Sequence, residues 1–202
     1  MTDLDLALSD LAFIQGRLAA STRFRGLAPH AVAATGVLAL VLAGTQTIAP
    51  DRFGATGLSF VLAWVAAAAL AAGLVATEAL ERARRLHGGL ADRLVAGTLR
   101  LLLPFGAAGA AVTLAVVRTA PEAVWILPGL WQMLIALIGF AAVGTLPPAI
   151  VWPAAWYFAC GTATLFLAGE ARAPTPWMMG LPFGVGQAIV AVVLHRAGRD
   201  GR

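Results

Sequence analysis

The long charged interval of the chain is Glu78 to Arg100, EALERARRLHGGLADRLVAGTLR, and it separates two hydrophobic blocks. The chain has 202 residues, of which 60% are hydrophobic and only 12% are charged. In soluble domains about 25% of the residues are charged. The composition therefore excludes an ordinary soluble domain and indicates an integral membrane protein.

The two blocks divide into six apolar runs of about 17 to 25 residues, long enough as helices to cross a hydrocarbon core of about 30 Å. In lipid such runs must be helical, because an open strand leaves backbone groups unpaired. We predict an all-α, polytopic fold with six transmembrane helices arranged as three hairpins. The membrane domain is expected over residues 25–196, before a basic tail at 197–202, with spans at about 27–47, 55–80, 94–117, 123–143, 149–168 and 177–194.

An amphipathic helix is predicted in the cytoplasmic segment 1–24, ahead of the first span. Thr2 and Asp5 have the spacing of a helix-capping box. Aliphatic residues then recur every three or four positions on one helical face, at Leu4, Leu8, Leu11, Ile14 and Leu18. Such a helix lies on the membrane surface or against the bundle; the alternative is a docking helix for a partner.

All 14 basic residues are arginine, and their distribution predicts orientation. With six spans, eleven arginines fall on the side of the termini, and only Arg52, Arg118 and Arg172 on the other. Cytoplasmic loops carry the excess of basic residues, so both termini are expected in the cytoplasm of a bacterium, with the protein in its inner membrane. The expected contacts to a partner or to lipid on that face are Arg17, Arg23, Arg25, Arg82, Arg84, Arg85, Arg93 and Arg100.

Prolines interrupt the last four spans, at Pro104, Pro128, Pro153 and Pro182. Broken helices occur in transporters, although kinks or first-turn positions explain the prolines more simply. For a transporter or ligand-binding bundle, the candidate cavity-lining residues are Gln132, Tyr157 and Gln187. The small residues Gly106, Gly109 and Ala110 are expected to let helices pack closely.

No catalytic, metal or cofactor motif is recognisable, so the protein is expected to have no enzymatic activity. His30, His87 and His195 all fall at span ends, where interfacial positions are favoured over the alternative of haem ligation. Cys160 lies within an apolar run, where packing is its expected role. The basic charge follows from membrane topology, so no nucleic-acid partner is expected.

The opening LSDLAFIQGRLAASTRFRGLAPHAVAATGVLALVLAG resembles a family of uncharacterised bacterial inner-membrane proteins, in which an amphipathic segment leads into the first of six spans. The likeness continues through ARRLHGGLADRLVAGTLRLLLPFGAAGA and LPGLWQMLIALIGFAAVG to Phe183-Gly-Val-Gly186. It implies six spans and a gene often placed beside a winged-helix transcription regulator. Gln187 stands where a histidine often follows these glycines in the family, so a ligand role for that histidine does not transfer.

Most of the informative polar residues lie on the predicted cytoplasmic face. This pattern favours a non-enzymatic accessory or regulatory membrane protein that contacts a protein partner or anionic lipid there. The alternative is a small transporter or ligand-binding bundle that uses the proline-interrupted helices. Besides the bilayer, the expected partners are a cytoplasmic or membrane protein, in a homo-oligomer or a larger complex.

Overall fold

A computed structural model of the protein describes residues 28–53, 56–87 and 91–200. The predicted amphipathic helix and Arg17, Arg23 and Arg25 lie outside this part of the chain.

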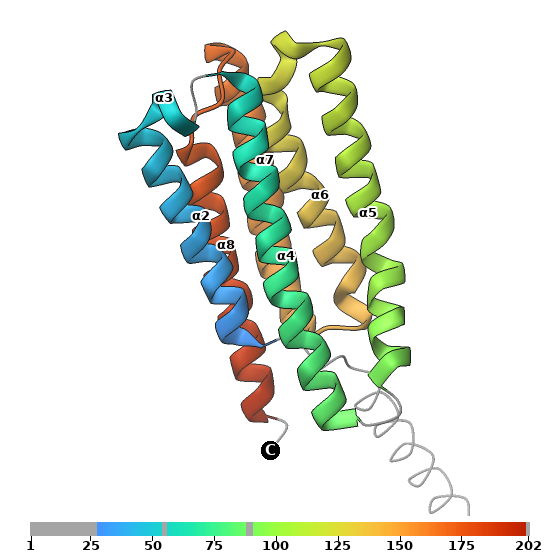
Figure 1. Ribbon diagram of the computed structural model, residues 1–202. Helices are drawn as coiled ribbons and strands as arrows, with labels where there is room; N and C mark the ends of the chain where they lie inside the picture. The colour runs from blue at the N-terminus through green and yellow to red at the C-terminus, as the bar shows by residue number, and fades with distance from the viewer. Residues whose placement is uncertain (1–27, 54–55, 88–90, 201–202) are drawn as a thin grey trace, which may run out of the picture.

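The described chain is a bundle of long helices (Figure 1). Every regular element in these residues is helical, and six helices are long and apolar enough to cross a membrane. The predicted all-α, six-span architecture is therefore confirmed. The longer elements are α2 (Pro29–Ile48), α4 (Gly57–His87), α5 (Ala91–Thr119), α6 (Leu127–Ala141), α7 (Val151–Ala171) and α8 (Trp177–Asp200). The short ones are α3 (Pro50–Phe53), η2 (Pro121–Ile126), η3 (Ala142–Gly144) and η4 (Pro148–Ile150).

Local chemistry sets several of these boundaries. Pro29 begins α2, where its missing N–H breaks no helical hydrogen bond. Before α4, the backbone N–H of Ser59 donates to the Thr56 hydroxyl oxygen at 3.1 Å, and the Thr56 N–H donates to the Ser59 hydroxyl oxygen at 2.9 Å. This reciprocal pair is a capping box that starts α4. Within α5 the helix continues through Pro104.

Two helix pairs form the tightly packed part of the bundle. Among the described helices, α2 packs most extensively along α8, and α6 along α7. Glycines make these contacts close: a Cβ added at Gly161 of α7 would lie 2.9 Å from the carbonyl oxygen of Gly129 in α6. On α8, Gly184 faces Leu40 of α2 in the same way, with a Cβ 2.7 Å from Leu40 Cγ. Since helices in lipid associate through close van der Waals packing, these positions fix both pairs.

The hairpin of α4 and α5 is packed more loosely against the four other helices. None of the residues in Leu102–Thr119, the apolar part of α5, is buried in the bundle. The expected close packing at Gly106 is wrong, since no described residue lies within 4 Å of a Cβ added there. Gly109 does meet another helix, but at the ordinary distance of 3.5 Å from Leu134.

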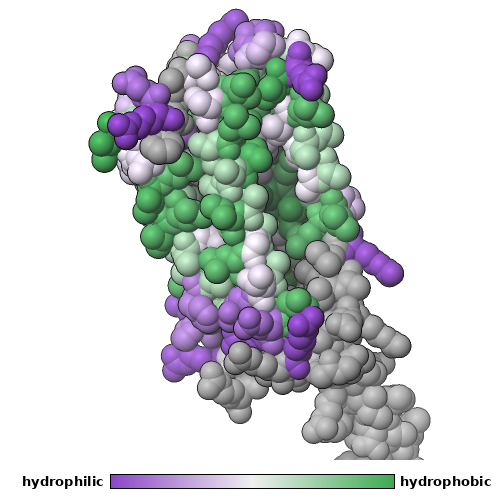
Figure 2. Space-filling model, in the orientation of Figure 1, coloured by the Kyte–Doolittle hydropathy of each residue, from purple (hydrophilic) through white to green (hydrophobic). Residues whose placement is uncertain are grey.

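The bundle has two polar ends separated by an apolar belt (Figure 2). At one end α2 begins, α8 ends and α4 is joined to α5 (Figure 1). At the other end lie α3 and the last turns of α5 and α7. The arrangement suits a protein whose middle lies in hydrocarbon and whose ends reach water.

Candidate functional site

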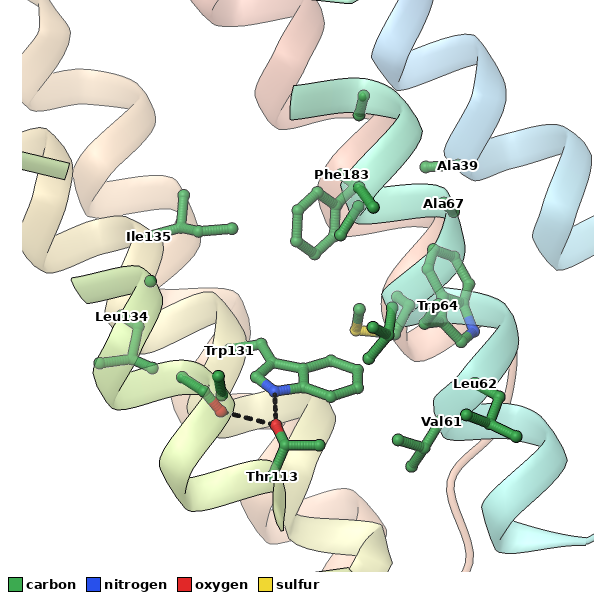
Figure 3. Close-up of a pocket in the computed structure, with 18 of the residues that line it drawn as sticks. Ala39, Val61, Leu62, Trp64, Ala67, Thr113, Trp131, Leu134, Ile135 and Phe183 are labelled. Carbon is green, nitrogen blue, oxygen red and sulfur yellow. Dashed lines mark hydrogen bonds between the residues drawn. The ribbon is translucent and has the colours of Figure 1, made fainter. Parts of the chain in front are cut away.

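A cavity of about 830 Å³ lies between the hairpin of α4 and α5 and the helices α2, α6 and α8. Figure 3 shows Trp131 projecting from α6 into this space, opposite Val61 and Trp64 of α4. Leu134 and Ile135 line it beside Trp131, and Phe183 lines it from α8 (Figure 3). The cavity exists because α4 and α5 do not close tightly on the paired helices.

The polar groups in the wall mostly bond to the protein. The Trp131 indole N–H donates to the Thr113 hydroxyl oxygen at 2.9 Å, and that hydroxyl donates to the Gly109 carbonyl at 2.7 Å. The Trp64 N–H donates to the Gln46 amide oxygen of α2 at 2.9 Å. The Thr35 hydroxyl donates to the Val32 carbonyl at 2.7 Å. These bonds leave a wall that offers mainly hydrocarbon to an occupant, and water requires polar partners to fill a cavity.

The cavity opens sideways, toward the apolar belt. Its wall includes residues that are also exposed on the outer surface of α4 and α5, among them Leu62, Val65 and Leu114. The surface is hollowed between these two helices in Figure 2. In a bilayer this opening faces acyl chains, so a molecule can enter it without crossing water.

One of the three residues that we considered as cavity-lining lines the cavity. Gln187 lies in its wall, whereas Gln132 and Tyr157 are buried between helices outside it. Tyr157 is 2% exposed; its ring is 5.3 Å from that of Phe183, between ring centres, and covers Gly186. Its hydroxyl lies beside the Gln187 amide, but finds no partner in good hydrogen-bond geometry among the described residues.

Gln132 completes the backbone of a neighbouring helix. Pro182 lies inside α8 and has no N–H, so the Met178 carbonyl four residues earlier loses its helical partner. The Gln132 amide nitrogen, fully buried on α6, donates to that carbonyl at 2.8 Å. The sequence predicted Gln132 to line a cavity or to bond between helices. The signal for its actual partner was Pro182, because a proline inside a helix leaves the carbonyl four residues earlier without its helical hydrogen bond.

The structure describes the side chains of three of the arginines that we predicted to bind a partner or lipid. Arg82 is half-buried near the end of α4, and Arg84 and Arg100 are exposed. Arg85 lies in α4 and Arg93 in α5, but their side chains are not among those the structure describes.

Two of the histidines that we considered for haem are exposed. The His30 imidazole, 75% exposed, lies 3.6 Å from the Glu78 carboxylate, so it links the start of α2 to α4 when protonated. His195 is exposed on α8, and the His87 side chain lies outside the description. Within the described residues, no three His, Cys, Asp or Glu side chains are grouped to hold a metal ion.

Comparison with protein-family models, with curated proteins and with solved structures yields no match to this chain.

Proposed function

We propose that the protein is a non-enzymatic membrane protein that binds a hydrocarbon chain, the acyl or isoprenoid chain of a membrane lipid, between the α4–α5 hairpin and the paired helices. The observation that carries this proposal is the cavity of about 830 Å³ with an apolar wall and a lateral opening. It corresponds to the ligand-binding alternative from the sequence, with a hydrocarbon chain as the ligand.

The lateral opening of the cavity supports an occupied state. Its wall is apolar and continues into residues exposed on the outer surface of α4 and α5. Because an apolar space offers few polar partners to water, hydrocarbon from the bilayer is the occupant that suits it.

A polar substrate has less support. The cavity reaches Gln187 but not Gln132, and the Gln132 amide nitrogen is used by the Met178 carbonyl. Pro128 and Pro153 lie in the first turns of α6 and α7, where proline is tolerated. Only Pro104 and Pro182 lie inside helices.

The test is the lipid that remains bound after purification. Ala67 lines the cavity, and Ala67→Phe places a ring in it; Ala72 is exposed on the same helix outside the cavity, so Ala72→Phe is the matched control. After extensive detergent washing, mass spectrometry should find stoichiometric lipid on the natural protein and on Ala72→Phe, and much less on Ala67→Phe. Equal lipid on all three proteins would contradict the proposal.

A second candidate role is that of an accessory or regulatory protein in the bacterial inner membrane, with both termini in the cytoplasm. It is favoured by the arginines near the end where α4 meets α5 and α8 ends, and by the resemblance to six-span inner-membrane proteins. A protein partner or anionic lipid would bind that end. Deleting residues 2–20 should remove a co-purifying protein if the N-terminal segment docks it, and an unchanged set of partners would count against this role.

A further inference from the structure

A second hollow lies on the opposite side of α8 from the cavity. It is a groove of about 1050 Å³ between α8, Leu40 of α2, the turn at Pro147 and Pro148, and Trp152 of α7. The two hollows share no lining residue among those described. A ligand in the groove is therefore independent of the one proposed for the cavity.

The groove has the length of a lipid chain. On α8 its lining runs from Leu181 to Arg196 and Ala197. At 1.5 Å per residue, the rise from Leu181 to Arg196 is about 22 Å. Half of a hydrocarbon core measures about 15 Å, so the groove holds an extended acyl chain of one leaflet with room for the glycerol region.

The groove is apolar along its length and basic at one end. Its α8 side consists of aliphatic and small residues until Arg196, which is exposed near the C-terminal end of the helix. None of the described residues that line it is acidic. Trp152, 69% exposed, lies across from α8, in keeping with the preference of tryptophan for the headgroup region.

We propose that this groove binds an anionic phospholipid, with one acyl chain along α8 and the phosphate on the Arg196 guanidinium. The charge decides between lipids: a guanidinium pairs with a phosphate through two parallel hydrogen bonds. A zwitterionic lipid has the same phosphate, but its own cation competes for it. The groove therefore favours phosphatidylglycerol over phosphatidylcholine.

The binding experiment compares these two lipids on the purified full-length protein in a non-ionic detergent. Lipid binding is followed by native mass spectrometry. One arginine near the membrane surface contributes enough for about a fivefold preference. We expect the natural protein to bind phosphatidylglycerol about fivefold more tightly than phosphatidylcholine, and Arg196→Gln to bind both equally.

Three variants serve as controls. Arg199 is exposed on the same helix but does not line the groove, so Arg199→Gln should keep the preference. Ala188 is exposed and lines the apolar part of the groove, so Ala188→Trp should weaken the binding of both lipids to the same extent. Arg196→Lys keeps the charge and should retain part of the preference, which separates charge from misfolding.

Three outcomes would overturn the proposal. The first is equal binding of the two lipids to the natural protein, and the second is an unchanged preference for phosphatidylglycerol in Arg196→Gln. The third is displacement of phosphatidylglycerol by millimolar inorganic phosphate, which would indicate an anion site that does not bind the acyl chain. Loss of lipid from the cavity in Ala67→Phe leaves this preference unchanged, so the two proposals fail separately.

Discussion

At the scale of single residues, several buried polar groups here bond to the backbone or to one another. Gln132 donates to the carbonyl that Pro182 leaves unpaired, and the Trp156 N–H donates to the Pro182 carbonyl at 3.0 Å. Trp64 is 4% exposed and donates its indole N–H to the Gln46 amide oxygen. In an apolar medium an unpaired polar group is costly, so these contacts specify which helices meet.

The pairing of Gln132 with the proline-freed carbonyl predicts a coupled pair of substitutions. Gln132→Met leaves the Met178 carbonyl without its partner and should lower the free energy of unfolding by about 1–3 kcal/mol. In a Pro182→Ala background, the new N–H at position 182 bonds that carbonyl, so Gln132→Met should cost about 1 kcal/mol less. Unfolding of the detergent-solubilised protein by sodium dodecyl sulfate measures both effects, and simple additivity would contradict the assignment.

At the scale of helices, glycine positions separate the tight pairs from the loose hairpin. Gly36, Gly180 and Gly184 lie where α2 meets α8, and Gly129, Gly139 and Gly161 where α6 meets α7. Gly73 of α4 and Gly106 of α5 are different, because no described residue lies within 4 Å of a Cβ added at either position. Glycine thus permits close packing at the six positions between paired helices, whereas Gly73 and Gly106 lie in open space.

This contrast predicts opposite responses to one added methyl group. In Gly129→Ala the Cβ would lie 2.6 Å from Leu165 and 2.9 Å from the Gly161 carbonyl oxygen. Because that oxygen belongs to the backbone, α6 and α7 must separate, and we expect a loss of about 1–3 kcal/mol in unfolding free energy. Gly106→Ala, where the space is open, should be neutral or slightly stabilising by helix propensity. Thermal unfolding in detergent compares them, and equal midpoints would contradict the pairing.

At the scale of the whole molecule, the sequence predicted the features that depend on composition. It missed those that depend on which side of a helix meets lipid and which side meets another helix. Hydropathy suffices to find six helices, because the bilayer demands their length and apolarity. Hydropathy does not tell that Gly129 meets another helix and Gly106 does not, because lipid tails are as apolar as leucine. Apart from Gln187, the lining of the cavity escaped prediction for the same reason: residues such as Ala67 and Leu134 look alike whether they face lipid, a helix or a void.

Orientation is the whole-molecule prediction that follows from charge. Arg82, Arg84, Arg196 and Arg199 lie toward the end where α8 terminates, and the positive-inside rule predicts that this end is cytoplasmic.

Single cysteines introduced in a Cys160→Ala background test this orientation. In intact cells a membrane-impermeant maleimide should label Arg118→Cys, near the opposite end of the bundle, and spare Arg199→Cys. In inverted membrane vesicles the pattern should reverse, because the label then reaches the cytoplasmic face. Labelling of Arg199→Cys in intact cells would mean that the arginine-rich end faces outward, and an anionic inner leaflet could then not supply the lipid at Arg196.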